Sequence, residues 1–561
     1  MTALQVDQGE LDDVGAGPRP SAVALPSFLA ALVAAVVVLF GWHGSDLPNQ
    51  VYRVTLFHRY GLLTFDTFWY GGHYFFTYSV LTPILAGTVG LRVLGAASAV
   101  AATVAYAHLA RRHLGAGARL SSVVFALGTA VPLLIGEITF LPGLAFGLIA
   151  VLALDHRRRV AATVLALACT LASPLAGLFL LMAIGAWAYA LSGPAEVARP
   201  ATLGRLLARL RASIRQSPEG PGLAGHAAVM AAAAAPLAIS VLAFHESGSY
   251  HFPVQQLVTV FACTALGWCV VPKRMRALRA GLVIYSLTAV ALFVVPNPVG
   301  GNLVRLGAYL APALVAALCW NRKRALALLL VPALIWQWST GVSALTGARG
   351  DATRSASYFQ PLLDRLAHVA PDERLEIPFT AQHWEAAYVA PHVPLARGWE
   401  RQTDQANNPL FYGGHHLTAA EYRSWLDDNG VSLVALPDAT LDPAGEAEAA
   451  LIRQGLPYLH RIWHAGHWTL WRVERSPGLV SGAARLSAVT PDRFTLTATR
   501  ATTVTVRFHY TRTWAVTAGQ ACIEPTADGW TRVHLLEPGS VTVTARPFHA
   551  GADCPASVEP R

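Results

Sequence analysis

Residues 21–42 read SAVALPSFLAALVAAVVVLFGW and carry no charged side chain. A helix rises 1.5 Å per residue, so this stretch reaches about 33 Å and can cross a hydrocarbon core about 30 Å thick. Apolar stretches recur as far as residue 345, and the remaining residues have the composition of a soluble protein. Of the 561 residues, 54% are hydrophobic and 13% are charged, about half the charged fraction of soluble domains. The chain is therefore predicted to be a polytopic membrane protein.

Residues 1–20 lack the basic start of a cleaved signal peptide, so we expect residues 21–42 to be retained as the first helix. Basic residues gather in clusters at 111–119, 157–159, 199–215, 273–279 and 322–324, which alternate with loops that hold almost no Lys or Arg. Because cytoplasmic loops are enriched in Lys and Arg, this layout predicts about eleven transmembrane helices, a cytoplasmic N-terminus and an extracytoplasmic C-terminal part. The spans are expected at 22–42, 94–111, 120–135, 138–154, 160–174, 175–192, 223–244, 254–272, 280–296, 302–320 and 325–344. The same clusters account for the net charge of +9 without a nucleic-acid partner.

This alternation requires that residues 80–94 do not cross the membrane. The segment is short, contains Pro83 and Gly87, and has Arg92 near its end. A re-entrant or interfacial helix is tolerated where protein covers its backbone, and we expect one here. The alternative is a short true span, which would invert the topology of every later helix.

Composition divides the chain into three parts. Residues 1–345 are expected to form the membrane domain, with a long external loop at 43–93. Residues 346–475 mix strand and helix patterns and predict an extracytoplasmic α/β module, whereas residues 476–561 alternate with period two and predict a β-sandwich-like module. Cys522 and Cys554 are the only cysteines of these two modules, and an oxidising compartment would permit a disulfide between them. The expected fold class is a mainly α polytopic membrane bundle followed by these two modules.

The first external loop contains the candidate catalytic groups. Asp46 follows the first apolar stretch directly, and a carboxylate that close to lipid is costly to keep, which marks it as functional. Asp66, further along the loop, is the second candidate. Asp46 could instead cap a helix, because Ser45-Asp46 before a proline is a good helix start, and Asp66 could belong to a turn.

Arginines at the outer face could bind a phosphate through both guanidinium nitrogens. Arg53, Arg59 and Arg305 are the candidates, and Arg305, one turn into a span, either has a partner or extends to the surface. Aromatic residues among polar ones suit a sugar, because a ring stacks on its C–H face while polar groups bind its hydroxyls. The candidates of this kind are Trp69, Tyr70, His73, Trp384, Trp399, Glu400, Arg401 and Asp404. For Trp384, Trp399, Glu400, Arg401 and Asp404, the alternative is a loop against the membrane domain whose Trp and Arg side chains lie at the membrane interface.

The layout resembles that of the GT-C superfamily of membrane glycosyltransferases. The shared features are a first helix with an early aspartate in a long external loop, a re-entrant segment with a proline, a following helix that ends in Arg111-Arg112, about eleven spans and an external C-terminal part. The resemblance implies transfer of a sugar from a polyprenyl-phosphate donor at the outer face. It also implies that Asp46 acts as the base or orients the acceptor.

The leading hypothesis is therefore a glycosyltransferase of the plasma membrane that acts on a cell-envelope glycan, lipid or protein. Its expected partners are a lipid-linked donor, an envelope acceptor and membrane lipids. The sequence contains no spacing typical of a metal site or a nucleotide-binding loop, so no cofactor is expected. The alternatives are a transporter or flippase for a lipid-linked envelope precursor, although no paired half-bundles are visible, and a non-catalytic scaffold of envelope assembly.

Overall fold

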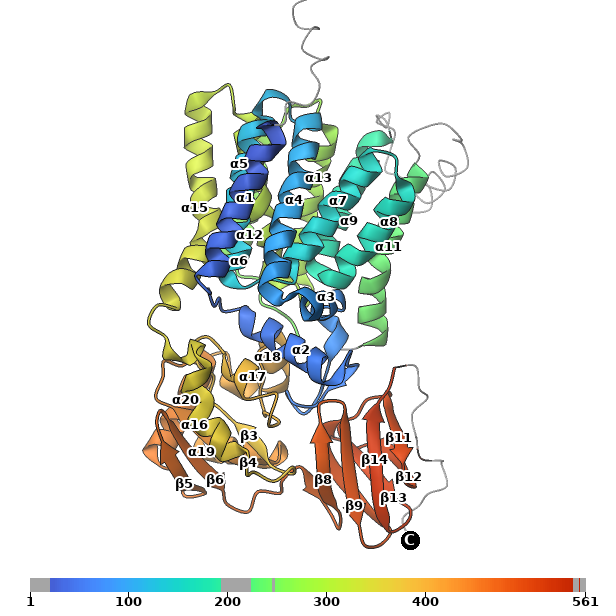
Figure 1. Ribbon diagram of the computed structural model, residues 1–561, viewed down its shortest axis with the longest axis vertical. Helices are drawn as coiled ribbons and strands as arrows, with labels where there is room; N and C mark the ends of the chain where they lie inside the picture. Colours follow the sequence, from blue (N-terminus) through green and yellow to red (C-terminus); the bar gives the residue numbers. More distant parts are fainter. Residues whose placement is uncertain (1–20, 193–222, 245–247, 548–553, 555–561) are drawn as a thin grey trace, which may run out of the picture.

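The computed structural model describes residues 21–192, 223–244, 248–547 and Cys554 (Figure 1). The predicted acidic N-terminal segment and the basic cluster at 199–215 lie outside these residues. Along its longest axis the molecule consists of a bundle of helices and, below it in the figure, two modules that contain sheets (Figure 1). The last bundle helix, α15 (Lys323–Gly347), leads into the first of these modules.

The bundle is built from helices that are apolar along most of their length. They are α1 (Ser21–Leu39), α4 (Leu91–His113), α5 (Ala118–Gly128), α6 (Ala130–Ile135), α7 (Phe140–Asp155), α8 (Arg159–Ala172), α9 (Pro174–Leu191), α11 (Leu223–Ala243), α12 (Val254–Val270), α13 (Arg276–Val294), α14 (Val304–Leu318) and α15. In the described part of the chain, eight helical stretches are long and apolar enough to cross a membrane, and α7, α8 and α12 are shorter apolar helices. Large side chains such as Phe28, Val164 and Leu287 are more than half exposed on the outside of the bundle, as expected of a surface that faces lipid. The chain is an integral multi-pass membrane protein.

Residues 80–94 contain a short helix and the start of a long one. The short helix, α3 (Leu81–Val89), ends at Gly90, whose φ of 88° is accessible to glycine without strain. Nine residues rise only about 14 Å, less than half of a hydrocarbon core. α3 is thus too short to cross a membrane, which agrees with the predicted re-entrant or interfacial helix.

The loop at 43–93, which is predicted to be external, is a folded unit. It contains α2 (Leu47–Tyr60), a hairpin of β1 (Phe65–Asp66) and β2 (His73–Tyr74), and a single 3₁₀ turn at Phe75–Thr77. The Phe65 side chain is part of the hydrophobic core of the second module. Two carbonyls of the loop accept backbone hydrogen bonds, that of Phe68 from Leu395 and that of Gly71 from His509, both at 2.8 Å. The loop therefore joins the bundle to both modules.

The first module packs helices around a four-stranded sheet of order β3-β4-β6-β5. β3 (Arg374–Glu376) is parallel to β4 (Val431–Pro437), and β6 (Trp468–Val473) and β5 (Leu459–Ala465) are antiparallel to their neighbours. The helices are α16 (Ala356–Leu366), α17 (Glu385–Tyr388), α18 (Arg401–Asn407), α19 (Ala419–Asp428) and α20 (Pro443–Gln454). α19 begins with a capping box, in which Thr418 and Glu421 satisfy each other's backbone N–H groups. Every residue of β4 is buried, because the sheet has packing on both faces.

The second module is a pair of antiparallel sheets of order β12-β13-β10-β7 and β11-β14-β9-β8. The strands are β7 (Val480–Ser481), β8 (Arg485–Thr490), β9 (Arg493–Ala498), β10 (Thr502–His509), β11 (Trp514–Ala518), β12 (Ala521–Pro525), β13 (Trp530–Leu535) and β14 (Gly539–Ala545). The predicted period of two is visible in β10, where Val504, Val506 and Phe508 are buried and alternate with more exposed residues. Cys522 and Cys554 form a disulfide with an S–S distance of 1.97 Å.

Candidate functional site

Asp46 lies between α1 and α2, at the end of the bundle that faces the first module. Its backbone N–H donates to the Ile135 carbonyl at 2.9 Å, and the residue occupies the N-cap position of α2. Its side chain, however, accepts no hydrogen bond from the first turn of that helix. The carboxylate oxygen Oδ2 instead lies 3.7 Å from Nη2 of Arg305. Asp46 therefore occupies the position of a helix cap, but its side chain faces Arg305 and caps no backbone N–H.

Arg305 has a second carboxylate partner in Glu137. Its Nη2 lies 3.1 Å from Oε1 of Glu137, whose other oxygen accepts a hydrogen bond of 2.9 Å from the Tyr309 hydroxyl. Glu137 follows Gly136, which has a φ of 89° and lies so close to Leu47 that an added Cβ would meet its backbone at 2.6 Å. Only glycine lets the turn after α6 approach the start of α2 in this way. Three segments far apart in the sequence thus place two carboxylates against one guanidinium.

The first module contributes a second charged group. Asp442 caps α20 by accepting from the backbone N–H of Ala444, and its Oδ2 also lies 2.5 Å from Arg401 and 3.3 Å from His383. Partial burial opposes ionisation, but the hydrogen bonds from His383 and Arg401 hold the pKa of Asp442 well below its usual range. His383 has a φ of 55°, a conformation that is strained for any residue other than glycine and that clusters at functional sites.

The two charged groups line one cavity of 390 Å³. The bundle side contributes Asp46, Glu137 and Arg305, and the module side contributes His383, Trp399, Arg401 and Asp442, together with further residues of both. The indole N–H of Trp399 donates to the Ser45 carbonyl at 3.1 Å, which fixes the ring beside Asp46. A space of this volume with one aromatic wall and several convergent polar groups is typical of a small-molecule site. We call it the Asp46 cavity.

A second cavity of 490 Å³ adjoins the first and lies between bundle helices. It shares Ser45, Glu137 and Arg305 with the Asp46 cavity, and α15 contributes Trp336, Gln337 and Ser343. Arg305 therefore lies at the junction of a cavity bounded by the first module and a cavity bounded by α14 and α15. We call the latter the interhelical cavity.

Burial raises the pKa of the Asp46 carboxyl to about 7. Arg305 opposes this shift because it stabilises the charged form, Glu137 adds to it, and His383 also opposes it. A carboxyl group with a pKa near neutrality can both accept and release a proton at physiological pH.

Asp66 and the two arginines of the first loop lie elsewhere. Asp66 is fully buried, where its carboxylate accepts from the Tyr52 hydroxyl at 2.7 Å and from the Phe68 backbone at 2.9 Å, so it closes the hairpin turn. Arg53 is buried in a salt bridge of 2.5 Å to Glu400, and Arg59 donates to the Pro391 carbonyl at 2.9 Å. None of the three lines the Asp46 cavity or the interhelical cavity.

Most of the predicted sugar-binding residues are buried in packing. Trp69 stacks on Tyr52 and on His73, and Tyr70 packs edge-on against both Trp69 and His73. Trp384 is buried against His43. Of the predicted site residues, the structure brings together Asp46, Arg305, Trp399 and Arg401 in the Asp46 cavity.

Three charged residues of the Asp46 cavity were missing from the sequence-based set: Glu137, His383 and Asp442. The sequence signal for Glu137 is a lone carboxylate in a short loop between two apolar spans, which is equally typical of a structural residue. Asp442 precedes a proline, a pattern typical of a helix start, and it does cap α20. His383 belongs to an aromatic and charged patch but carries no pattern of its own.

A buried ionic network supports the segment that carries Trp399 and Arg401. The Arg397 guanidinium lies between the rings of Phe379 and Phe411, at 4.0 Å from each. It pairs with Asp404 at 2.7 Å and with Glu448 at 2.9 Å. Asp404, predicted to bind a sugar, is therefore the counter-ion of the structural residue Arg397. The two residues lie at the two ends of the segment 397–404.

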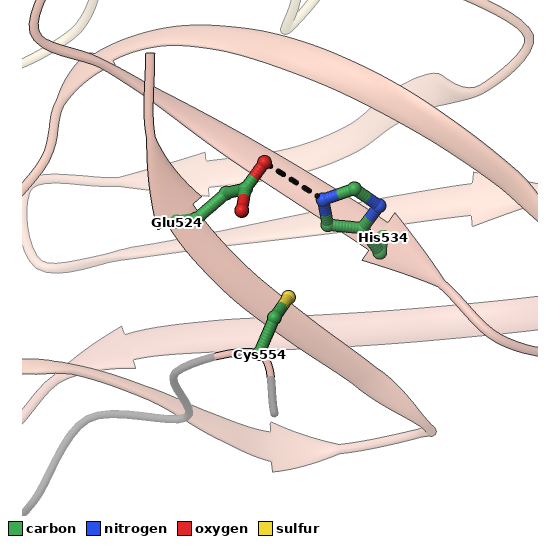
Figure 2. A group of neighbouring side chains, drawn as sticks. All are labelled: Glu524, His534 and Cys554. Carbon is green, nitrogen blue, oxygen red and sulfur yellow. Dashed lines mark hydrogen bonds and ion pairs between the residues drawn. The ribbon is translucent and has the colours of Figure 1, made fainter. Parts of the chain in front are cut away.

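One group of side chains in the described part of the chain has the composition of a metal site: Glu524, His534 and Cys554 in the second module (Figure 2). Figure 2 shows the three converging on one another, with Nε2 of His534 3.1 Å from Glu524. The Cys554 sulfur is bonded to Cys522 and therefore has no thiolate to offer a metal. We assign no metal to this group.

No protein-family model and no curated protein matches the chain. It resembles several solved structures, two of which follow. A mutant of the arabinofuranosyltransferase AftD from Mycobacteria has a TM-score of 0.49 at 14% identity, over 95% of this chain and 60% of that chain. The apo oligosaccharyltransferase of Archaeoglobus fulgidus has a TM-score of 0.45 at 13% identity, over 74% and 69%. The chain thus spans less than two thirds of the AftD chain, and at these identities the likeness concerns the fold alone.

Proposed function

We propose that the chain is a glycosyltransferase that moves a sugar from a polyprenyl-phosphate donor to a hydroxyl of a cell-envelope glycan, lipid or protein. One observation carries the proposal: Asp46 and Arg305 lie 3.7 Å apart where the interhelical cavity meets the Asp46 cavity. A lipid-linked donor can reach Arg305 from between the membrane helices, and a water-soluble acceptor can reach Asp46 from the side of the first module. Between these two entrances, the Asp46 carboxylate can accept the proton of the acceptor hydroxyl. The Arg305 guanidinium can stabilise the negative charge of the departing phosphate.

In the proposed reaction, Asp46 accepts the proton of the acceptor hydroxyl while the hydroxyl oxygen bonds to C1 of the donor sugar. The bond between C1 and the phosphate oxygen breaks, and its electron pair leaves with the polyprenyl phosphate. Arg305 stabilises the added negative charge through charge-assisted hydrogen bonds. Trp399 offers its ring to the sugar, and Glu137 and Tyr309 hold Arg305 in position.

The bundle geometry supports a topology of eleven crossings, with the Asp46 cavity on the outside. α4 starts beside α3 near the modules, and at its other end Arg112 pairs with Asp155, the last residue of α7, at 2.9 Å. The shorter α7, α8 and α12 connect the same two ends of the bundle as the longer helices (Figure 1). The basic loops at 111–119, 157–159, 273–279 and 322–324 then share the end opposite the modules. The excess of Lys and Arg marks that end as cytoplasmic and the modules as facing outward from the plasma membrane.

A transfer assay tests this function. Purified protein in lipid nanodiscs is given a panel of radiolabelled polyprenyl-phosphate sugars and envelope glycan acceptors. We expect label to appear in an acceptor. If a control enzyme uses the same donors and the chain transfers nothing, the proposal is wrong, and the transporter or scaffold alternatives are then tested by movement of the labelled lipid across vesicles.

Replacement of Arg305 by Gln is expected to lower kcat/KM for the donor by roughly 10- to 10²-fold, because a hydrogen bond to a charged group contributes about 1.5–3 kcal/mol. Arg305→Lys should fall between the wild type and Arg305→Gln, since lysine keeps the charge but loses the two-pronged contact. Initial rates at varied donor concentration measure the effect. Arg324→Gln, an exposed arginine at the start of α15, is the matched control and should change nothing. Equal activity of Arg305→Gln and the control would remove Arg305 from the donor site.

The pH profile of kcat/KM should follow the protonation of Asp46. Burial raises the pKa of this carboxyl to about 7, and only the deprotonated form is a base, so the rate should rise through neutral pH and level off above it. At lower pH it should fall about tenfold per pH unit. Initial rates from acidic to mildly alkaline buffer measure the profile. A midpoint near the usual pKa of an exposed aspartate, or a rate that falls as the pH rises through 7, would contradict the assignment.

A further inference from the structure

A further cavity lies between the first loop, the end of α11, α18 and the second module. It has a volume of 670 Å³, and we call it the distal cavity. His73 and Tyr74 of the first loop, Thr403 and Asn407 of α18, and His509 and Thr511 of the second module are among its lining residues. None of these residues lines the Asp46 cavity. The function proposed for the Asp46 cavity gives no role to the distal cavity.

One short helix connects the two spaces. Gln402 of α18 lines the Asp46 cavity, and Thr403 and Asn407 line the distal cavity. Between them, Gln402, Gln405 and Ala406 line an open cavity of 510 Å³ together with Gly248 and Ser249. α18 spans seven residues, which is about 10 Å of helix. Thr403 and Asn407 lie on one face of α18, and Gln402, Gln405 and Ala406 lie on another, so the three cavities surround this helix. α18 lies between the bundle and the modules (Figure 1).

Three amide side chains along this path are free to bind a ligand. Within the described residues, the side-chain amides of Gln402, Gln405 and Asn407 make no hydrogen bond, although each amide can both donate and accept. His73 is 3% exposed and stacks on Trp69, and its Nε2 lies 3.8 Å from Oδ2 of Asp66. An imidazole at the wall of a cavity can add a hydrogen bond from a ligand or water to these contacts.

The chemistry of the path favours a carbohydrate chain. Amides, hydroxyls and an imidazole donate and accept in turn, as sugar hydroxyls require, and Phe65 and Tyr74 add ring surface. Among the described residues that line the distal cavity, Arg512 is the one charged side chain. A peptide that binds by strand addition would need a free strand edge, but β10, which ends at this cavity, is paired with β13 on one side and with β7 on the other.

We infer that the distal cavity is a second acceptor subsite, which holds an extended glycan whose far end reaches Asp46 along α18. The inference rests on the proposed function and adds to it the class of acceptor: a glycan chain longer than the Asp46 cavity can hold. Such a subsite lowers KM for long acceptors and leaves short ones almost unaffected, because short acceptors fill the Asp46 cavity alone.

The test compares acceptors of two and of eight sugar residues, prepared from arabinan, mannan, galactan and dextran. The variant is Asn407→Ala combined with Gln405→Ala, two exposed side chains whose loss does not affect packing. The control is Gln454→Ala, an exposed amide at the end of α20. Binding of each oligosaccharide is also followed by saturation-transfer NMR without donor, so that a result is obtained even where no sugar is transferred.

We expect the wild type to prefer the eight-residue acceptor. The double variant should raise KM for that acceptor roughly 5- to 150-fold, since each of the two lost hydrogen bonds contributes about 0.5–1.5 kcal/mol, and should leave kcat and the control unchanged. Transfer that is insensitive to both acceptor length and the variant would overturn the inference and leave the proposed function standing. If the long oligosaccharide binds, its binding weakens in the variant and no sugar is transferred, the result would support the subsite and contradict the proposed transferase activity. Binding of an unglycosylated peptide in place of the oligosaccharide would overturn the carbohydrate assignment.

Discussion

Replacement of Asp46 by Asn should lower kcat by about 10²–10⁴-fold, the range that a positioned general base contributes. Asparagine has nearly the shape of aspartate but cannot accept the proton of the acceptor hydroxyl. The Asp46 side chain caps no backbone N–H, so its loss should leave α2 and the fold unchanged. KM for the donor should change little, because Arg305 keeps Glu137 as a partner at 3.1 Å. Steady-state rates of sugar transfer measure the effect.

Two aspartates serve as controls for this prediction. Asp528, exposed in the turn between β12 and β13, should tolerate Asp528→Asn without any change in rate. Asp66→Asn should lower stability instead of catalysis, because the Asp66 carboxylate accepts from Tyr52 and from the Phe68 backbone and lines neither the Asp46 cavity nor the interhelical cavity. If Asp46→Asn keeps full activity while Asp66→Asn, still folded, loses it, the two roles are the reverse of those proposed.

Replacement of Arg397 by Met should destabilise the first module by about 3–5 kcal/mol, the usual cost of removing one partner from a buried ion pair. The guanidinium is 1% exposed and contacts Asp404, Glu448 and two aromatic rings. Methionine fills part of the space but leaves the carboxylates buried without a cation. A fall in melting temperature of roughly 10 °C or more is expected for a module of this size. Thermal unfolding of the purified protein measures it.

The pair of the exposed Arg472 and the partly buried Glu373, at 2.6 Å on the same module, provides the matched control. Surface ion pairs contribute about 0–1 kcal/mol, so Arg472→Met should barely move the transition. Adding Glu448→Gln to Arg397→Met should restore part of the loss, because one buried charge fewer remains unpaired. A melting temperature that is equal in Arg397→Met and Arg472→Met would show that the buried network contributes little.

The candidate site depends on this network although no member of it lines the Asp46 cavity. Arg397 and Asp404 hold the ends of the segment that carries Trp399, Glu400 and Arg401. Trp399 and Arg401 reach the cavity, whereas Glu400 turns away to pair with Arg53 in the first loop. A loss of stability at Arg397 should therefore also weaken the docking of the first loop on the module.

Much of the fold could be predicted from local patterns. Each predicted span corresponds to a helical stretch, α3 lies in the segment predicted not to cross, and the period-two stretches are strands of the second module. Residues 346–475 contain both strands and helices, as their mixed pattern predicts. What was not foreseen is that the first loop is folded and packs against both modules, with Phe65 inside the core of the second. A single buried aromatic in a loop of mixed composition carries no local period.

The sequence by itself determined the class of the protein and the position of Asp46 at the mouth of the first helix. These follow from local causes, since a hydrocarbon core selects apolar stretches of sufficient length and makes a carboxylate at its edge conspicuous. Only the tertiary structure decided which arginine faces which carboxylate. Arg53 and Arg305 were equal candidates, and Arg53 is neutralised by Glu400, 347 positions away in the sequence. Coulomb interactions depend on distance in space, and the packing that sets this distance is not written in any local stretch of residues.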